Sequence, residues 1–260
     1  MNPVLEVIQN RKSVRAYLDK PIPQAEKDAI LQAALRAPSA GNMMLYSIIE
    51  VDDQRIKEQL VKTCDNQPFI ARSPFVLLFL ADYQRWYDYF VATGVPQRCA
   101  EAQTVMRKPG EGDLFLACCD ALIAAQTAVI AAESLGIGSC YIGDIMENFE
   151  AHREIFDLPQ YVFPITMLCF GYPTPQQQER SLTERFDQKY VVYQNQYKRL
   201  TPQDFEAMYQ SRHAQIFRER ETLKGAENVG QWMYFRKFDV EFMREMSRSS
   251  QAILKAWLEE

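Results

Sequence analysis

Three cationic side chains and a hydroxyl group fall within residues 11–15 of the segment 11–17, whose sequence is Arg-Lys-Ser-Val-Arg-Ala-Tyr. A guanidinium group presents a planar fork of donors that matches the oxygens of a phosphate, and lysine and serine add further donors. Arg11, Ser13 and Arg15 alternate, so an extended backbone directs all three to one side. The segment therefore predicts a binding site for a phosphate monoester. A solvated basic turn is the alternative, and these seven residues alone favour it, because charge runs are usually surface.

Two further polar stretches could contact a flat ligand. Residues 38–42, Pro-Ser-Ala-Gly-Asn, are small enough for a backbone to approach a ring, and Ser39 and Asn42 can hydrogen-bond its edge. Gln67 carries an amide with both donor and acceptor, which suits a uracil-like ring edge. The alternatives are a simple connecting loop at 38–42 and an ordinary polar loop residue at Gln67.

Cysteines and histidines give no sign of metal or nucleophilic chemistry. Only two histidines occur, and none of the six cysteines forms a Cys-x-x-Cys or Cys/His ligand pattern. Cys118, Cys119 and Cys169 lie in apolar runs, so we expect the cysteines to be reduced and to belong to the core. The Gly136-x-Gly138 pair is no dinucleotide fingerprint, because a helix precedes it and a strand follows.

The bulk composition is that of a soluble globular protein. The chain has 260 residues, 47% of them hydrophobic and 24% charged, and its formal charge of −5 argues against a general nucleic-acid binder. No stretch approaches 18 uninterrupted apolar residues, so no membrane span is expected. The N-terminus lacks the basic and apolar regions of a secretory signal. These features predict a cytoplasmic protein without a structural metal.

Hydrophobic periodicity predicts alternating helices and strands. Helices are expected from Asn2 to the basic segment, at 24–36, 53–64, 112–135 and 147–156, from 201 and from about 239. Strands are expected at 45–51, 75–80, within 137–144, at 162–170 and, as a short candidate, at 190–193. The helix at 112–135 is apolar nearly all round, which predicts burial on every side and a central or subunit-interface position. Residues 82–111 are rich in aromatic side chains and form either a lid over a ligand pocket or a helix packed on the body.

Four separated motifs, in this order, make the chain resemble the FMN-dependent nitroreductase family. They are Arg11-Lys-Ser-Val-Arg15, Ala37-Pro-Ser-Ala-Gly-Asn42, Ala132-Glu-Ser-Leu-Gly-Ile-Gly-Ser-Cys-Tyr-Ile-Gly143 and Leu168-Cys-Phe-Gly-Tyr-Pro173. The resemblance covers residues 3 to 200 and implies an α+β fold in which helices wrap a central mixed sheet. It also implies an intertwined homodimer with FMN at the interface. We therefore expect an FMN-binding domain at 1–200 and a helical C-terminal extension at 201–260 that packs on this domain or on the dimer partner.

The resemblance assigns a role to each candidate site residue. The phosphate would be held by Arg11, Lys12, Ser13 and Arg15, joined by a basic residue after the last core strand, Arg185 or its rival Arg180. Ser39, Gly41 and Asn42 would come from the partner chain, and Gln67 would reach the pyrimidine edge of the flavin. Tyr141, Ile142 and Gly143 would line the ring, with the Gly143 N–H directed near N5.

The implied activity is a two-step shuttle in which NAD(P)H reduces the flavin and then a nitroaromatic, quinone or flavin takes two electrons. No catalytic side chain and no metal is implied. The chain departs from the family pattern at Met44, often glutamine, and at Asp144, often glycine. These departures leave two alternatives open: a non-catalytic dimer that stores FMN, and a specialised relative such as a dehalogenase or a flavin-fragmenting enzyme.

Overall fold

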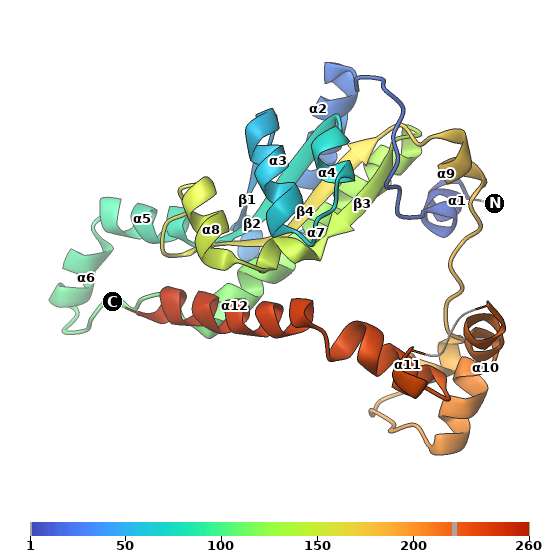
Figure 1. Ribbon diagram of the computed structural model, residues 1–260. Coiled ribbons are helices and arrows are strands. Elements are labelled where there is room, and N and C mark those ends of the chain that lie inside the picture. The colour runs from blue at the N-terminus through green and yellow to red at the C-terminus, as the bar shows by residue number, and fades with distance from the viewer. Residues whose placement is uncertain (1, 220–222, 260) are drawn as a thin grey trace. The chain divides into compact units, whose positions relative to one another are not determined.

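The computed structural model describes residues 2–219 and 223–259 (Figure 1). The chain divides into two compact units, Met1–Leu182 with Glu245–Glu260 and Thr183–Arg244. The sequence placed a division near residue 200 instead. In the structure the polar stretch from Thr183 groups with the helices that follow it, and the end of the last helix belongs to the larger unit.

The larger unit is built on a four-stranded sheet with the strand order β1-β2-β4-β3. The strands are β1 (Tyr46–Glu50), β2 (Phe75–Asp82), β3 (Gly138–Ile142) and β4 (Val162–Gly171). All three pairings are antiparallel, so the α+β class is as expected but the mixed sheet is not. The one parallel contact among the described residues is the isolated bridge between Ser13 and Ser139, where the N-terminal segment runs beside β3 without becoming a strand.

The central strand β2 is buried along its whole length, as its continuous apolar sequence predicts. Successive side chains alternate between the two faces of the sheet. Phe75, Leu77 and Phe79 belong to the cluster under α7, and their neighbours belong to the cluster on the opposite face. Helices therefore cover both faces.

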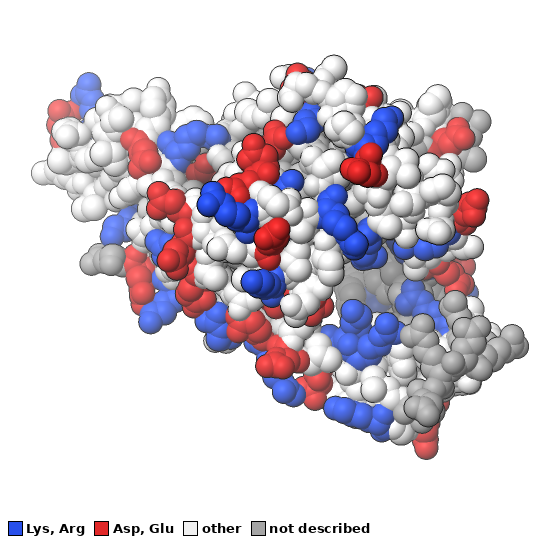
Figure 2. Space-filling view, turned by 45° about the horizontal axis from the view of Figure 1, so that its top comes forward, with Lys and Arg blue, Asp and Glu red and all other residues white. Residues whose placement is uncertain are grey.

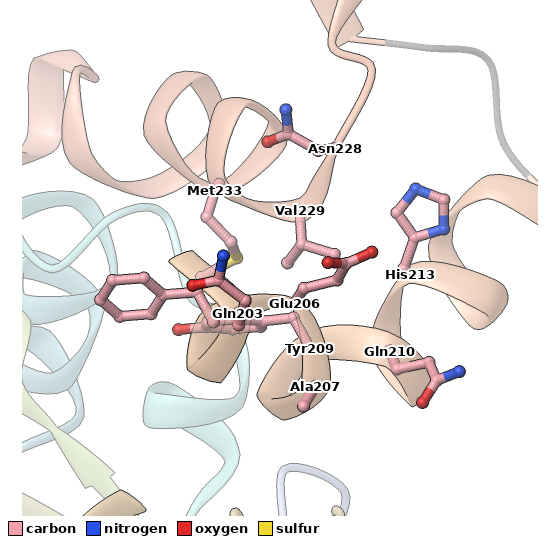
Figure 3. Close-up of a pocket in the computed structure, with 11 residues that line it drawn as sticks. Gln203, Glu206, Ala207, Tyr209, Gln210, His213, Asn228, Val229 and Met233 are labelled. Atoms are coloured by element: carbon pink, nitrogen blue, oxygen red, sulfur yellow. The ribbon is translucent and has the colours of Figure 1, made fainter. Parts of the chain in front are cut away.

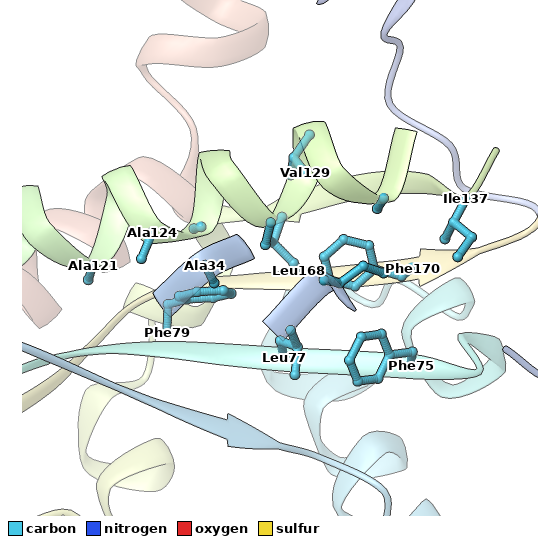
Figure 4. Packing of buried hydrophobic residues seen from close by; sticks show 14 of the residues in the cluster. Ala34, Phe75, Leu77, Phe79, Ala121, Ala124, Val129, Ile137, Leu168 and Phe170 are labelled. Atoms are coloured by element: carbon cyan, nitrogen blue, oxygen red, sulfur yellow. The ribbon is translucent and has the colours of Figure 1, made fainter. Parts of the chain in front are cut away.

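One face of the sheet is covered by α2 (Gln24–Leu35) and α7 (Glu111–Ser134), which also contact each other. The side of α7 that meets the sheet is mostly alanine, and Ala121 and Ala124 lie over the aromatic and leucine side chains of β2 and β4 (Figure 4). Alanines bring the helix axis close to the strands, so this contact is dense without large side chains on the helix.

The opposite side of α7 is not buried, which corrects the expectation of burial on every side. Phe115 is 64% exposed, and Leu116, Leu122 and Ile123 are more than 40% exposed. Cys119, which we expected in the core, is exposed on the same helix. α7 is long and apolar enough to cross a membrane. This is weak evidence for a membrane span, because the core helix of a soluble protein can have the same length and composition. The large apolar side chains on the far face therefore have no cover from their own chain.

The second face of the sheet is covered by α3 (Gln54–Thr63) and α4 (Phe69–Arg72), and α8 (Phe149–Ile155) contacts η2 (Gly143–Met146). Asp53 caps α3, because its carboxylate accepts from the Arg55 N–H at 2.7 Å. His152 of α8 is fully buried between the Ile145 carbonyl and the Thr63 hydroxyl, each 2.8 Å from a ring nitrogen. Burial lowers the pKa of this histidine, so it is a neutral structural residue.

The aromatic segment forms two short helices, α5 (Gln84–Ala92) and α6 (Val95–Glu101). The Tyr87 ring lies 5.1 Å from the Tyr161 ring, and the Tyr161 ring lies 5.5 Å from that of Trp257. Trp257 comes from the end of α12 (Glu241–Leu258), and its indole N–H donates to the Gly110 carbonyl at 3.2 Å. The structure thus packs the aromatic segment on the body of the larger unit.

Short helices complete the chain. The larger unit also contains α1 (Pro3–Asn10), η1 (Ala40–Asn42), η2 (Gly143–Met146) and α9 (Pro175–Glu179), and the smaller unit contains η3 (Gln188–Tyr190), α10 (Pro202–Glu219), η4 (Leu223–Gly225), α11 (Val229–Met233) and the π-helical turn η5 (Tyr234–Phe238). The predicted strand at 190–193 is wrong. A 3₁₀ turn ends at Tyr190, whose carbonyl accepts from the Tyr193 hydroxyl, so the apolar pair between them closes a turn instead of pairing with a strand.

Candidate functional site

The N-terminal cationic segment, residues 11–18, lies across the start of β3 and the end of β4. The N–H of Val14 donates to the Ser139 carbonyl at 2.8 Å, and the N–H of Leu18 donates to the Tyr172 carbonyl at 2.8 Å. Val14 is buried while Arg15 is exposed, as an extended backbone with alternating side chains requires. The sheet therefore fixes the backbone from which the cations project.

Two glycines allow this close approach. A Cβ atom on Gly138 would lie 2.5 Å from Val14 Cγ2, and one on Gly171 would lie 2.5 Å from Tyr17 Cδ1. Such distances are far below van der Waals contact, so any larger residue must displace the N-terminal segment. Gly138 of the third sequence motif and Gly171 of the fourth are thus explained by close contact with the side chains of Val14 and Tyr17.

Replacing Gly138 by alanine tests this contact. We expect the free energy of unfolding to fall by about 1–3 kcal/mol, the usual cost of overpacking a closed site. Retention of FMN on gel filtration should fall with it, because Ser13 and Arg15 move. Gly112→Ala is the matched control, since nothing lies within 4 Å of its added methyl group. Equal melting temperatures for the two variants would contradict the proposed contact.

The cations of the N-terminal segment gather beside α9 and β3. Lys12 Nζ donates to the Gln178 and Arg180 carbonyls at 2.6 Å each, and the Arg180 guanidinium donates to the Ser13 carbonyl. Burial raises the pKa of the Cys140 thiol, while Arg15 and Arg11 oppose the shift. Both guanidinium groups are therefore near Cys140 of β3.

The two rival arginines lie in different units. Arg180 is in the larger unit, beside Ser13 and Lys12. Arg185 is in the smaller unit, where its guanidinium donates to the Thr183 carbonyl at 3.3 Å. The turn of α9 that brings Arg180 back to Ser13 had no counterpart in the sequence analysis, which named Arg180 only as the rival of Arg185.

Glu133 is a site residue that the sequence analysis missed. It lies in the last turn of α7, and its buried Oε1 has no hydrogen-bond partner among the described residues. Burial raises the pKa of this carboxyl to about 7, and the nearby Arg11 and Lys12 oppose the increase. The signal was a single acid within an otherwise apolar motif, Ala132-Glu-Ser. It places a carboxyl group near Arg11 and Lys12.

The loop that carries Ser39, Gly41 and Asn42 lies at another part of α7. The carboxylate of Asp120 accepts from the Ala40 N–H at 3.0 Å and from the Leu45 N–H at 3.1 Å. Asp120 and Glu133 are on the order of 20 Å apart along the helix axis, at 1.5 Å per residue. Figure 1 likewise shows α1 and α9 at one end of the sheet and α5 at the other. One copy of the chain therefore brings together the residues predicted to bind phosphate but separates them from the loop at 39–42.

The residues expected to line the flavin ring lie at the end of β3 and directly after it. Gly143 opens η2 directly after the strand, and η2 contacts α3, which precedes Gln67. The Gln67 amide donates to the Cys64 carbonyl at 3.1 Å, and the Tyr141 hydroxyl donates to Gln126 Oε1 at 3.1 Å. The Ile142 side chain is fully buried in the core, so it offers a ligand only its backbone.

Glu147, which follows η2, is a buried carboxyl among other acids. It is 7% exposed, and its Oε1 has no hydrogen-bond partner among the described residues. Burial raises its pKa to about 7, and repulsion by Asp144, Asp65 and Glu245 adds to the shift. Because the folded protein holds this proton more tightly than the unfolded chain, stability from this group is lost as the pH rises from about 4.5 through 7.

Glu147→Gln should therefore raise the melting temperature at pH 8 by roughly 2–4 °C and change it little at pH 5. The amide cannot ionise, so the cost of the buried charge disappears only where the wild-type group is charged. Thermal denaturation at both pH values measures the effect, with the exposed Glu154 of α8 as the control position (Glu154→Gln). A shift of the same size at pH 5 and pH 8 would refute the ionisation argument.

A cavity in the smaller unit is lined by none of the predicted site residues. It has a volume of about 870 Å³ between α10 and α11, and Figure 3 shows Glu206, Tyr209 and His213 around it. Within the described residues no group of three His, Cys, Asp or Glu side chains could hold a metal ion. Size alone therefore does not identify the site that the cationic segment defines.

An antiparallel sheet between helical layers, crossed by a cation-bearing N-terminal segment, is the nitroreductase fold. The solved structure of the NfrA1 nitroreductase from B. subtilis is 25% identical in sequence with a TM-score of 0.79, and the match covers 98% of both chains.

The chain belongs to the nitroreductase family, whose family model matches residues 8–172. An oxygen-insensitive NADPH nitroreductase of Salmonella typhimurium is 32% identical over 77% of each chain. An FMN reductase [NAD(P)H] of Bacillus subtilis is 32% identical over 76% of this chain and 75% of its own. The resemblance inferred from the four motifs is confirmed.

Proposed function

We propose that the protein is an FMN-dependent NAD(P)H oxidoreductase that reduces small aromatic acceptors such as nitroaromatics, quinones or flavins. The observation that carries this function is the cationic segment, which Val14 fixes to β3 and Leu18 fixes to Tyr172 just after β4. Its kinship with an NADPH nitroreductase and an FMN reductase supports the same chemistry. When bound, FMN accepts a hydride from NAD(P)H and passes two electrons to the acceptor.

The residues of the larger unit fit the phosphate end of FMN. Arg11, Lys12 and Arg15 supply positive charge, and the Ser13 hydroxyl adds a donor. Arg180, already hydrogen-bonded to the Ser13 carbonyl, is the basic residue that we assign to this end, in preference to Arg185. β3 and α9 hold these cations in place before the phosphate binds. Binding of a dianionic phosphate therefore costs little side-chain entropy, and more of the electrostatic attraction contributes to its affinity.

The ring end is built from the edge of β3 and from a second copy of the chain. Gly143 offers its N–H to the ring, and the amide of Gln67 has a second N–H and an oxygen for the pyrimidine edge. The loop with Ser39, Gly41 and Asn42 packs on α7 too far from the cationic segment to reach an FMN bound there. We therefore assign these three residues to the site of the partner protomer. This assignment leaves each site incomplete without a dimer.

A homodimer is also supported by the uncovered face of α7. Phe115, Leu116 and Leu122 are exposed there, and α1, which contacts α7, exposes Val4 and Leu5. Large apolar side chains exposed together on one helix face mark a protein–protein contact in a water-soluble protein. A second copy that covers this face brings the loop of one chain toward the cations of the other.

The surface charge and composition fit a cytoplasmic enzyme that acts on small molecules. Acidic and basic side chains are interspersed on the face shown in Figure 2, with no broad basic area for nucleic acid. No side chain is required as a nucleophile or general acid in this proposal. The chain's own residues bind and orient the cofactor and exclude water from its surroundings.

Spectra and steady-state rates test the proposal. The purified protein should be yellow and dimeric, and it should oxidise NADPH or NADH when menadione or nitrofurazone is added. A colourless monomer that is indifferent to added FMN would overturn the proposal. A yellow dimer without NAD(P)H oxidation would instead support FMN storage, an alternative favoured by the extra charge of Asp144 beside the ring-lining Gly143. Activity on another substrate alone would indicate a specialised relative.

A further inference from the structure

The loop at residues 39–44 has a conformation that its own residues do not favour. Gly41 has a φ of 56°, Asn42 of 56° and Met44 of 50°. The left-handed region costs glycine little, but a non-glycine residue held there costs of order 1–3 kcal/mol. Such a loop persists only where surrounding groups determine its backbone. The described contacts show which groups do so.

From the side of the core, the loop is held by Asp120. This aspartate is the buried acid in the middle of the apolar helix α7, with an exposed fraction of 2%. Its carboxylate accepts from the N–H of Ala40 at 3.0 Å and from the N–H of Leu45 at 3.1 Å. These two residues stand at the two ends of the left-handed stretch, so one side chain fixes both ends.

From the opposite side, the loop is held by two side chains of α5. The indole N–H of Trp86 donates to the Met43 carbonyl at 2.7 Å, and the Arg85 guanidinium donates to the Met44 carbonyl. The start of α5 is itself fixed to the sheet, because Asp82 accepts from the Arg85 N–H at 3.2 Å and from the Ser47 hydroxyl at 2.5 Å. The aromatic helix is thus connected rigidly to the loop.

We propose that Asp120, Arg85 and Trp86 are positioning residues that hold the 39–44 loop ready to contact the flavin ring. The inference rests on the proposed function, because it concerns the same cofactor site. By this inference the aromatic segment supports the backbone of the loop and does not act as a lid that closes over a ligand. None of the three side chains needs to touch the cofactor.

Trp86→Phe is the decisive variant, because it removes the N–H donor and keeps most of the ring packing. Trp257→Phe is its matched control, since Trp257 also donates its indole N–H to one carbonyl, that of Gly110, and is 1% exposed. We expect Trp86→Phe to weaken FMN binding at least tenfold, measured by quenching of flavin fluorescence. Trp257→Phe should lower the melting temperature of the apoprotein at least as much and leave the Kd for FMN unchanged.

Riboflavin separates loop positioning from general damage. Because the loop faces the ring and not the phosphate, Trp86→Phe should weaken riboflavin and FMN binding by the same factor. Arg15→Ala should weaken FMN binding much more than riboflavin binding. Asp120→Asn should repeat the pattern of Trp86→Phe, with Asp113→Asn, another acid of α7 that accepts a backbone N–H, as its control.

The outcomes distinguish this inference from the proposed function. A wild-type protein that binds no FMN would defeat the proposed function itself. A wild-type protein that binds FMN, with equal Kd values for Trp86→Phe and Trp257→Phe, would overturn the positioning role alone. A riboflavin affinity that Trp86→Phe leaves intact while its FMN affinity falls would also overturn it, because the loop would then act on the phosphate.

Discussion

Arg15→Ala should yield a colourless protein that elutes from gel filtration without FMN. The side chain projects from a backbone that Val14 anchors to Ser139, so it meets the phosphate in a fixed geometry. A hydrogen bond between charged groups contributes about 1.5–3 kcal/mol, which corresponds to roughly a ten- to hundredfold loss of affinity. Absorbance of the eluted protein at flavin wavelengths and titration with FMN measure the loss.

Arg55→Ala controls for the removal of an exposed guanidinium in the same unit. Arg55 pairs with Asp53 on the surface of α3 and has an 89% exposed side chain, so its replacement should leave the colour unchanged. Arg15→Ala protein that stays as yellow as the Arg55→Ala protein would remove Arg15 from the phosphate site. Circular dichroism of both variants would exclude unfolding as the reason for a loss.

Mixed dimers should recover FMN binding from two inactive variants. Arg15→Ala damages the phosphate residues, and Gly41→Val damages the loop, because valine is strongly disfavoured at a φ of 56°. If each site combines the phosphate residues of one chain with the loop of the other, a mixed dimer has one doubly damaged site and one intact site. Co-expression with two affinity tags should therefore give about one tight FMN per mixed dimer, half the wild-type content, while each homodimer binds almost none.

The matched control for complementation is a mixed dimer of Arg11→Ala and Arg15→Ala. Both changes then lie in the same half of the site, so every site in the mixed dimer is damaged and no binding should return. Failure of the Arg15→Ala and Gly41→Val pair to recover binding would show that one chain builds the whole site. A chain that forms no dimer at all would refute the shared site more directly.

The sequence predicted the core elements well because their signals are local. The continuous apolar run of β2 and the alanine-rich pattern of α7 are each readable within one segment. Which side of α7 is buried could not be predicted from the sequence. Apolar residues such as Phe115 and Leu122 give the same sequence pattern whether they are covered by their own chain or by another. The antiparallel pairing was also hidden, since strand direction depends on contacts between distant segments.

The candidate site was predictable in part for the same reason. Arg11 to Arg15 form a local motif, and the alternation of their side chains follows from an extended backbone. Arg180 could be assigned to the site only from the turn of α9, and Glu133 only from its proximity to Arg11. A sequence motif reveals neither of these features. Asp120 left a usable signal, because a lone carboxylate in an apolar helix needs polar partners, and here these are the backbone N–H groups of a loop far away in the sequence.

The two-sided character of α7 has a consequence for anyone who engineers this protein. If the proposed homodimer forms through this face, substituting its outward leucines with polar residues to improve expression would yield well-behaved single chains. Such chains would keep every residue of both half-sites, yet neither half would meet its complement. Solubility and cofactor loading are therefore opposing goals on this helix.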